Sequence, residues 1–418
     1  MKRALLVLGL PVLCLLGLTA SAAPGLQVID TAHYLVHAEA TRAQTEEMGR
    51  VLEAAWPQLA KFFGAEPELA DGVKLNVFFG ATQQSFFARL KADGITPPKA
   101  GGYYSPKTRV AYLWRQPTIY NTRCLLIHEA THQFHFLSKT RNRSVPMTWY
   151  VEGLAEYLGR HYWDGESLRL GELPLLSLSD YSRKALESLN GEEVSLAKVI
   201  EGKGGGRPLF FAIVRYLLTG ENGKYRKSFA RLSKKLDRGA ASPALFSRTV
   251  GSPRKLEQKF REWLRHEQEP WRQIFNEWEG MGSGRFSGTA GGSIVSTCAV
   301  KAPVKRLSAT IEVPADGAWI AGVLLHHTDN GDYTTALSYG GKEIRVARRQ
   351  DHKWVTLGRF PGPKPKEKGL LRFVVERTGG KVRLLVEGKE MGTFELPGGT
   401  FGLALQGSTV RYRNVTWE

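Results

Sequence analysis

The hydrophobic pattern of this 418-residue chain changes its period near residue 280, and this change constrains the fold more than any other feature. Up to residue 278 apolar side chains recur mainly at helical spacing, whereas after residue 293 they alternate with a period of two. The chain is also longer than one ordinary hydrophobic core requires, so we expect two domains. Glycine and serine dominate residues 280–292, where we place a flexible linker.

The two patterns predict an α+β domain over residues 24–279 and an all-β sandwich over residues 293–418. In the first domain we expect strands at residues 27–37, 73–79 and 109–114, and helices at 41–63, 82–92, 121–138, 147–162, 208–218, 224–236 and 255–265. In the second we expect short strands at 307–313, 319–326, 333–337, 343–348, 354–358, 370–376, 381–386 and 401–405.

Residues 1–23 have the pattern of a secretory signal peptide. Lys2 and Arg3 precede an apolar run over residues 4–18, which ends in small residues. The run is shorter than a membrane span, and no later segment reaches 18 uncharged apolar residues, so we expect no transmembrane anchor. The mature protein is therefore predicted to be secreted or periplasmic. Its remaining cysteines, Cys124 and Cys298, make no disulfide framework, and a single bridge between domains is the less favoured alternative.

The chain is strongly basic, with a formal net charge of +18. Such a surface favours anionic neighbours, which include an envelope polymer, a lipid headgroup or an acidic substrate. Solubility without any partner explains the charge equally well. We expect no nucleic-acid partner, because the chain has no recognition motif and an exported protein rarely meets nucleic acid.

The sequence His-Glu-Ala-Thr-His at residues 128–132 carries the chemistry. On a helix, His128 and His132 project from one face one turn apart, so both imidazoles reach one Zn²⁺ ion. Glu129 then lies beside the open coordination position, where a carboxylate accepts a proton from water. The preceding apolar residues 125–127 favour a buried helix, for which Asn121 or Thr122 offers an N-cap.

A catalytic zinc site needs a third protein ligand, and the residues leave three candidates. His135 points the same way as His128 but lies about two turns along the axis, which favours packing over ligation. Glu152 and Glu156 stand four apart on the next predicted helix. One of these carboxylates can bind the ion while the other orients a ligand.

These two motifs, His-Glu-x-x-His and Trp-x-x-Glu-Gly-x-Ala-Glu-Tyr, resemble those of the gluzincin metallopeptidases. Residues 27–270 look most like the uncharacterised bacterial peptidase-MA-like proteins. The resemblance implies a gluzincin-like catalytic domain in which Glu152 is the third ligand of one Zn²⁺ ion and Glu156 supports the ligands from behind.

The resemblance also shows departures. Arg207 stands where aminopeptidase-type gluzincins have a Tyr that stabilises the oxyanion, and it is either a substitute donor or a surface residue. Tyr103, Tyr104 and Tyr157 are other candidate donors. The aminopeptidase element Gly-x-Met-Glu-Asn is not present in the sequence, which favours an endopeptidase. The segment at residues 101–104 is expected to form the edge strand on the substrate side.

The second domain is similar to concanavalin-like and laminin-G-like sandwiches on residues 321–325, 330–333, 402–405 and 414–417. Members of those families often bind glycans, and Trp319, Trp354 or Tyr333 would stack on sugars if exposed; core packing of these aromatics is the favoured alternative. The adjacent His326 and His327 face opposite sides of a strand and are interpreted as ordinary residues.

The sequence as a whole predicts a secreted zinc-dependent peptidase acting on a peptide or protein substrate. The alternative is a catalytically impaired zinc-binding protein that binds glycan or an anionic envelope polymer through its basic surface and sandwich.

Overall fold

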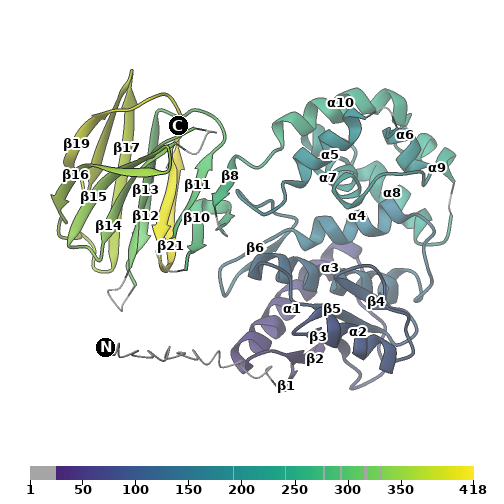
Figure 1. The fold of residues 1–418 in the computed structure, drawn as a ribbon. Helices are drawn as coiled ribbons and strands as arrows, with labels where there is room; N and C mark the ends of the chain where they lie inside the picture. The colour runs from purple at the N-terminus through teal and green to yellow at the C-terminus, as the bar shows by residue number, and fades with distance from the viewer. Residues whose placement is uncertain are drawn as a thin grey trace, which may run out of the picture.

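In the computed structural model, a mixed α/β part is followed by a β-sandwich (Figure 1). The described residues are 25–418 apart from 192, 241, 276–277, 292–293, 315–318 and 329–331. The predicted signal peptide, residues 1–23, lies outside them. No helix in this part of the chain combines the length and apolar character needed to cross a bilayer.

The α/β part begins with a five-stranded sheet of order β1-β2-β3-β5-β4. Its strands are β1 (Leu26–Asp30), β2 (Tyr34–Glu39), β3 (Leu75–Gly80), β4 (Gly102–Ser105) and β5 (Val110–Trp114). β2, β3 and β5 run parallel, and β4 pairs antiparallel with β5 at the edge. The segment expected to form an edge strand therefore does so.

Helix α1 (Arg42–Phe63) follows its predicted bounds closely. The Thr41 side chain caps its first turn, and Gly64 ends it in the left-handed conformation that glycine adopts without strain. Helix α2 (Gln83–Ala92) begins with a similar cap at Thr82. Local sequence signals were sufficient for both helices.

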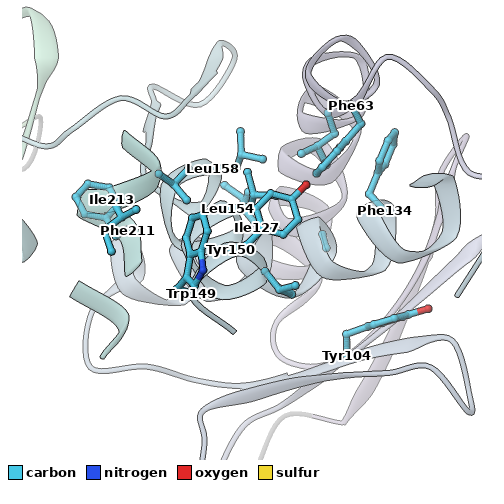
Figure 2. Close-up of a cluster of buried hydrophobic side chains, with 14 of the residues drawn as sticks. Phe63, Tyr104, Ile127, Phe134, Trp149, Tyr150, Leu154, Leu158, Phe211 and Ile213 are labelled. Carbon is cyan, nitrogen blue, oxygen red and sulfur yellow. The ribbon is translucent and has the colours of Figure 1, made fainter. Parts of the chain in front are cut away.

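Three helices form the centre of the first core: α3 (Ile119–Lys139), α4 (Thr148–Gly159) and α7 (Arg207–Gly223). Figure 2 shows Ile127 of α3 near Tyr150 of α4, and Phe134 of α3 beside Phe63 of α1, while Phe211 and Ile213 of α7 lie on the far side of Trp149. Gly153 lets α4 and α7 approach closely, because a Cβ there would lie 2.5 Å from the Phe210 carbonyl oxygen. This close approach brings the first residue of α7 beside α4.

Of the remaining helices, α5 (Tyr181–Asn190), α8 (Arg226–Leu236) and α10 (Pro253–His266) pack on α7. The short helices α6 (Leu196–Ile200) and α9 (Pro243–Thr249) pack on α10 and α8, respectively. The helix predicted to continue to residue 162 ends at Gly159 instead. Arg160 takes an extended conformation, and β6 (His161–Trp163) pairs with β7 (Leu168–Leu170). Pairing with a later segment therefore overrides helix propensity there.

Two seven-stranded antiparallel sheets form the sandwich. One has the order β19-β18-β17-β12-β21-β10-β9 and the other β16-β15-β14-β13-β20-β11-β8. The strands are β8 (Trp271–Phe275), β9 (Trp278–Met281), β10 (Arg285–Thr289), β11 (Val295–Val300), β12 (Arg306–Glu312), β13 (Ile320–His327), β14 (Tyr333–Tyr339), β15 (Glu343–Gln350), β16 (Lys353–Pro361), β17 (Leu370–Thr378), β18 (Lys381–Val386), β19 (Lys389–Glu395), β20 (Gly402–Gln406) and β21 (Thr409–Trp417).

The linker predicted over residues 280–292 is wrong for its described part. Residues 278–281 and 285–289 are strands, and β10 pairs with the C-terminal strand β21. The glycines there make room for buried rings: a Cβ at Gly280 would lie 2.5 Å from the Phe286 ring, and one at Gly288 would lie 2.8 Å from Trp278. The sandwich therefore begins near Trp271, ahead of the predicted boundary at residue 293.

Candidate metal centre

Helix α3 holds the His-Glu-Ala-Thr-His motif in a fully buried stretch, with every residue from 124 to 136 buried. The helix starts two residues earlier than predicted. Its N-cap is Thr118, whose side chain accepts a hydrogen bond from the Asn121 backbone N–H, so the expected caps Asn121 and Thr122 are wrong.

Three side chains direct ligand atoms at one point: His128, His132 and Glu152. The two Nε2 atoms of the histidines are 3.0 Å apart. Glu152 Oε2 lies 3.5 Å from His128 Nε2, and Glu152 Oε1 lies 3.6 Å from His132 Nε2. The side chains come from two helices, so packing of α3 on α4 assembles the group.

The donor atoms have the chemistry and spacing of a zinc site. A tetrahedral Zn²⁺ ion with bonds of about 2.0–2.1 Å separates its ligand atoms by roughly 3.3–3.4 Å. The distances here, 3.0–3.6 Å, are close to that spacing, with a different Glu152 oxygen facing each imidazole. Glu152 Oε2 is buried and has no hydrogen-bond partner. Arg207 Nη2 lies 3.6 Å from it, and a metal ion between the three groups would give this buried oxygen the direct partner that it lacks.

The pKa values of the three side chains diverge because they share one small space. Burial lowers the pKa of His128, but Glu156 and the other carboxylates outweigh burial and raise it. Burial and the neighbouring His128 lower the pKa of His132 to about 3. Burial alone raises the pKa of Glu152, but His128, His132 and Arg207 bring it to about 2. The carboxylate is therefore ionised beside the two imidazoles at neutral pH.

Glu129 is buried between α3 and the edge strand β4. Its Oε1 atom would lie 2.5 Å from a Cβ at Gly102, so this glycine makes room for the carboxylate. The backbone N–H of Tyr104 lies near it and favours its ionised form. Burial raises the pKa of Glu129 to about 7, against the lowering effect of His128 and Arg207. That value is suited to accepting and returning a proton near neutral pH.

Glu156 lies behind the donor triangle, one turn beyond Glu152 on α4. Its Oε1 atom is 3.6 Å from His128 Nδ1, on the side of the ring away from the triangle. Arg207 Nη1 is 3.3 Å from the same oxygen, and Arg207 Nη2 is 3.6 Å from Glu152 Oε2. Arg207 therefore lies at the site, with its guanidinium directed at two carboxylates.

The His135 ring and the hydroxyl groups of Tyr104 and Tyr157 make their contacts away from the triangle. His135 donates a hydrogen bond from Nε2 to Asp237 Oδ1 at 2.8 Å and stacks on Phe63, so it packs in the core as expected. Tyr104 donates to Asn142 through its hydroxyl, at 2.9 Å. Tyr157 packs against Gly171.

Sequence reasoning missed Arg160, which donates to Glu156 Oε2 at 3.2 Å and is buried. The signal was available, because Glu156 and Arg160 are spaced four apart on the predicted helix, the spacing of an ion pair. It missed Asp237 as the partner of His135, and no local pattern joins residues so far apart.

The sandwich aromatics divide into buried and exposed residues. Trp319 is only 3% exposed and belongs to the core. Tyr333 is also buried. Trp354 is 46% exposed and meets the Tyr333 ring edge-on at 5.5 Å. His326 and His327 are buried, and Cys124 and Cys298 are both buried free thiols. The described part of the sandwich thus offers one exposed tryptophan for stacking.

Comparisons with known proteins concern the fold of about a third of the chain. No protein-family model matches the sequence, and no curated protein matches it. Among solved structures it is similar to the carbohydrate-binding module CBM66 from Bacillus subtilis, at 15% identity over 36% of this chain and 95% of that one, with a TM-score of 0.31. Sheep galectin-11 in complex with glycerol shows 10% identity over 29% of this chain and 99% of that one, with a TM-score of 0.22.

The Caenorhabditis elegans galectin LEC-6 shows 15% identity over 34% of this chain and 95% of that one, with a TM-score of 0.23. At TM-scores this low, the likeness supports no conclusion on activity or ligand. None of the comparisons supports the gluzincin resemblance, which stays a prediction.

Proposed function

We propose that this chain is a zinc-dependent peptidase. The observation that carries the proposal is the triangle of His128, His132 and Glu152 ligand atoms, 3.0–3.6 Å apart, with the Glu129 carboxylate beside it. Two imidazoles, one carboxylate and an adjacent buried acid are the groups that hydrolytic zinc sites use.

Each side chain has a separate task in hydrolysis. A Zn²⁺ ion held by the triangle would lower the pKa of water and polarise a substrate carbonyl. Glu129 accepts the proton that the attacking water loses and delivers it to the leaving amine nitrogen. Contact with Gly102 confines the Glu129 carboxylate, and the nearby Tyr104 backbone N–H favours its ionised form.

The edge strand β4 supplies a template for an extended peptide. Trp114 N–H donates to the Gly101 carbonyl at 3.2 Å, so in the antiparallel alternation the backbone groups of Gly102 point away from β5. These groups lie next to Glu129. A substrate strand that paired with them would place its peptide bonds beside the triangle.

Cleavage of a mixed peptide library by the wild type and by Glu129→Gln tests the proposal. We expect the wild type to cleave peptides when zinc is present. The variant should retain the metal but cleave at least about 100-fold more slowly, because general-base catalysis contributes that much to the rate. Equal cleavage by both proteins, or no cleavage by a zinc-loaded wild type, would reject the peptidase function.

A second function, glycan binding by the sandwich, is favoured by one observation. Trp354 is half-exposed on β16 and is supported edge-on by Tyr333, an arrangement suited to stacking on a sugar ring. Binding of the full chain to a glycan array, compared between the wild type and Trp354→Ala, tests it. Signals that are equal in both proteins would reject Trp354 as a sugar platform.

A further inference from the structure

Arg160 is a buried cation with one carboxylate partner among the described residues. It follows the last residue of α4, and its side chain is 9% exposed. Its Nη2 atom is 3.2 Å from Glu156 Oε2, and its Nη1 atom is 3.6 Å from Cys124 Sγ. Its guanidinium also lies 3.9 Å from the centroid of the Tyr181 ring. A guanidinium placed so far from water depends on these contacts for its stability.

Glu156 divides its two oxygen atoms between different partners. Oε2 receives Arg160, whereas Oε1 faces both Arg207 Nη1 at 3.3 Å and His128 Nδ1 at 3.6 Å. Two guanidinium groups therefore contact the carboxylate, one at each oxygen. The Oε1 atom also faces the His128 ring.

The orientation of His128 decides whether its Nε2 atom can serve as a ligand. A neutral imidazole that binds a metal through Nε2 carries its proton on Nδ1, and a carboxylate facing Nδ1 favours that tautomer. Glu156 is the carboxylate in that place. A group that holds Glu156 in place therefore keeps its carboxylate opposite Nδ1 of His128, 3.6 Å away.

We propose that Arg160 is a positioning residue of the metal site, which sets the affinity for zinc through Glu156 and His128. This inference rests on the proposed zinc site. Arg207 differs from Arg160 because its side chain is 39% exposed and it also approaches Glu152, so substrate can reach it. Arg160 is sealed in the core and touches neither a ligand atom nor substrate.

The test measures zinc affinity by competition with a chromogenic chelator, together with the visible spectrum of the cobalt-substituted protein. The double variant Glu156→Gln/Arg160→Met removes both charges at once, so neither remains buried alone. We expect it to bind zinc about 10-fold to 100-fold more weakly than the wild type and to alter the cobalt spectrum, as loss of support behind a ligand does.

A matched control removes another Arg–Glu pair of the same domain. Arg215 on α7 pairs with Glu267 and lies 5.0 Å from the Trp263 ring centroid. The variant Arg215→Met/Glu267→Gln therefore also removes an Arg–Glu ion pair and a guanidinium–ring contact, but away from the triangle. Zinc affinity should be unchanged in this control. If both double variants bind zinc like the wild type, the positioning role is overturned, whereas a wild type that binds no zinc overturns the proposed function itself.

The conservative variant Arg160→Lys covers the case in which the double variant does not fold. Lysine keeps the charge but loses the planar guanidinium, which contacts Glu156 through one nitrogen and Cys124 through the other. We expect Arg160→Lys to bind zinc with an affinity between those of the wild type and the double variant. Its circular dichroism spectrum should show an intact fold. Wild-type affinity and an unchanged cobalt spectrum in Arg160→Lys would argue against the positioning role.

Discussion

Gly102 and Glu129 are in such close contact that a methyl group on the glycine would lie 2.5 Å from the carboxylate oxygen. Alanine at position 102 would therefore force the Glu129 side chain of α3 to shift away from the edge strand. The Tyr104 backbone N–H also favours the ionised form of this carboxylate, so the edge strand both confines the proposed general base and affects its charge.

Replacement of Gly102 by alanine should displace the Glu129 carboxylate. We expect a fall of about 10-fold to 100-fold in kcat/KM at unchanged zinc content, because a misplaced general base loses part of its contribution. Kinetics with a cleaved library peptide measure the effect. Gly101→Ala is the neighbouring control, because its Cβ would meet mainly the flexible Gln116 side chain, and it should stay near wild-type activity. Equal activities in the two variants would argue against the contact.

Replacement of Gly153 by alanine should destabilise the protein although alanine favours helices. A Cβ at this position would lie 2.5 Å from the Phe210 carbonyl oxygen, which is backbone and has little freedom to move. Overpacking of this kind destabilises a protein by about 1–3 kcal/mol. This exceeds the roughly 1 kcal/mol gained because alanine has a higher helix propensity than glycine. Urea denaturation measures the free energy of unfolding. A variant more stable than the wild type would show that α4 and α7 are not closely packed here.

Glu269 should make stability depend on pH. Burial, with a contribution from Asp180, raises the pKa of Glu269 to about 7, whereas the unfolded chain has an ordinary value near 4.5. The folded state holds the proton more tightly, so this contribution to stability is full below about pH 4.5 and is lost as pH rises through about 7. The total change amounts to roughly 3 kcal/mol.

Glu269→Gln removes the titrating group while keeping the shape of the side chain. The free energy of unfolding, measured from pH 5 to pH 8, should therefore fall less steeply in the variant than in the wild type. Parallel curves would mean that Glu269 does not hold a proton in the folded protein.

Helix ends and strands with strong local signals were predictable from the sequence. Thr41 and Gly64 bound α1 because a capping side chain and a left-handed glycine act locally. Most sandwich strands after residue 306 also lie where alternation placed them. The segment at residues 280–289 was misread because its glycines signal flexibility in isolation, whereas their use depends on Trp278 and Phe286, and on a strand at the far end of the chain.

The candidate site was also predictable in part. Helical spacing placed His128 and His132 on one face, and the family resemblance added Glu152; the structure brings the three together. The role of Arg207 was left open because its contacts depend on how closely α7 packs on α4. Arg160 was overlooked since its burial is a property of the packed core rather than of the helix.

Zinc content measured by mass spectrometry on purified, dialysed protein tests the central claim most directly. The wild type and Glu129→Gln should each hold about one zinc per chain, because Glu129 is placed beside the triangle rather than in it. The double variant His128→Ala/His132→Ala should hold almost none, because two of the three ligands are gone. Equal zinc content in the wild type and the double-histidine variant, or none in the wild type after zinc is supplied, would contradict the account.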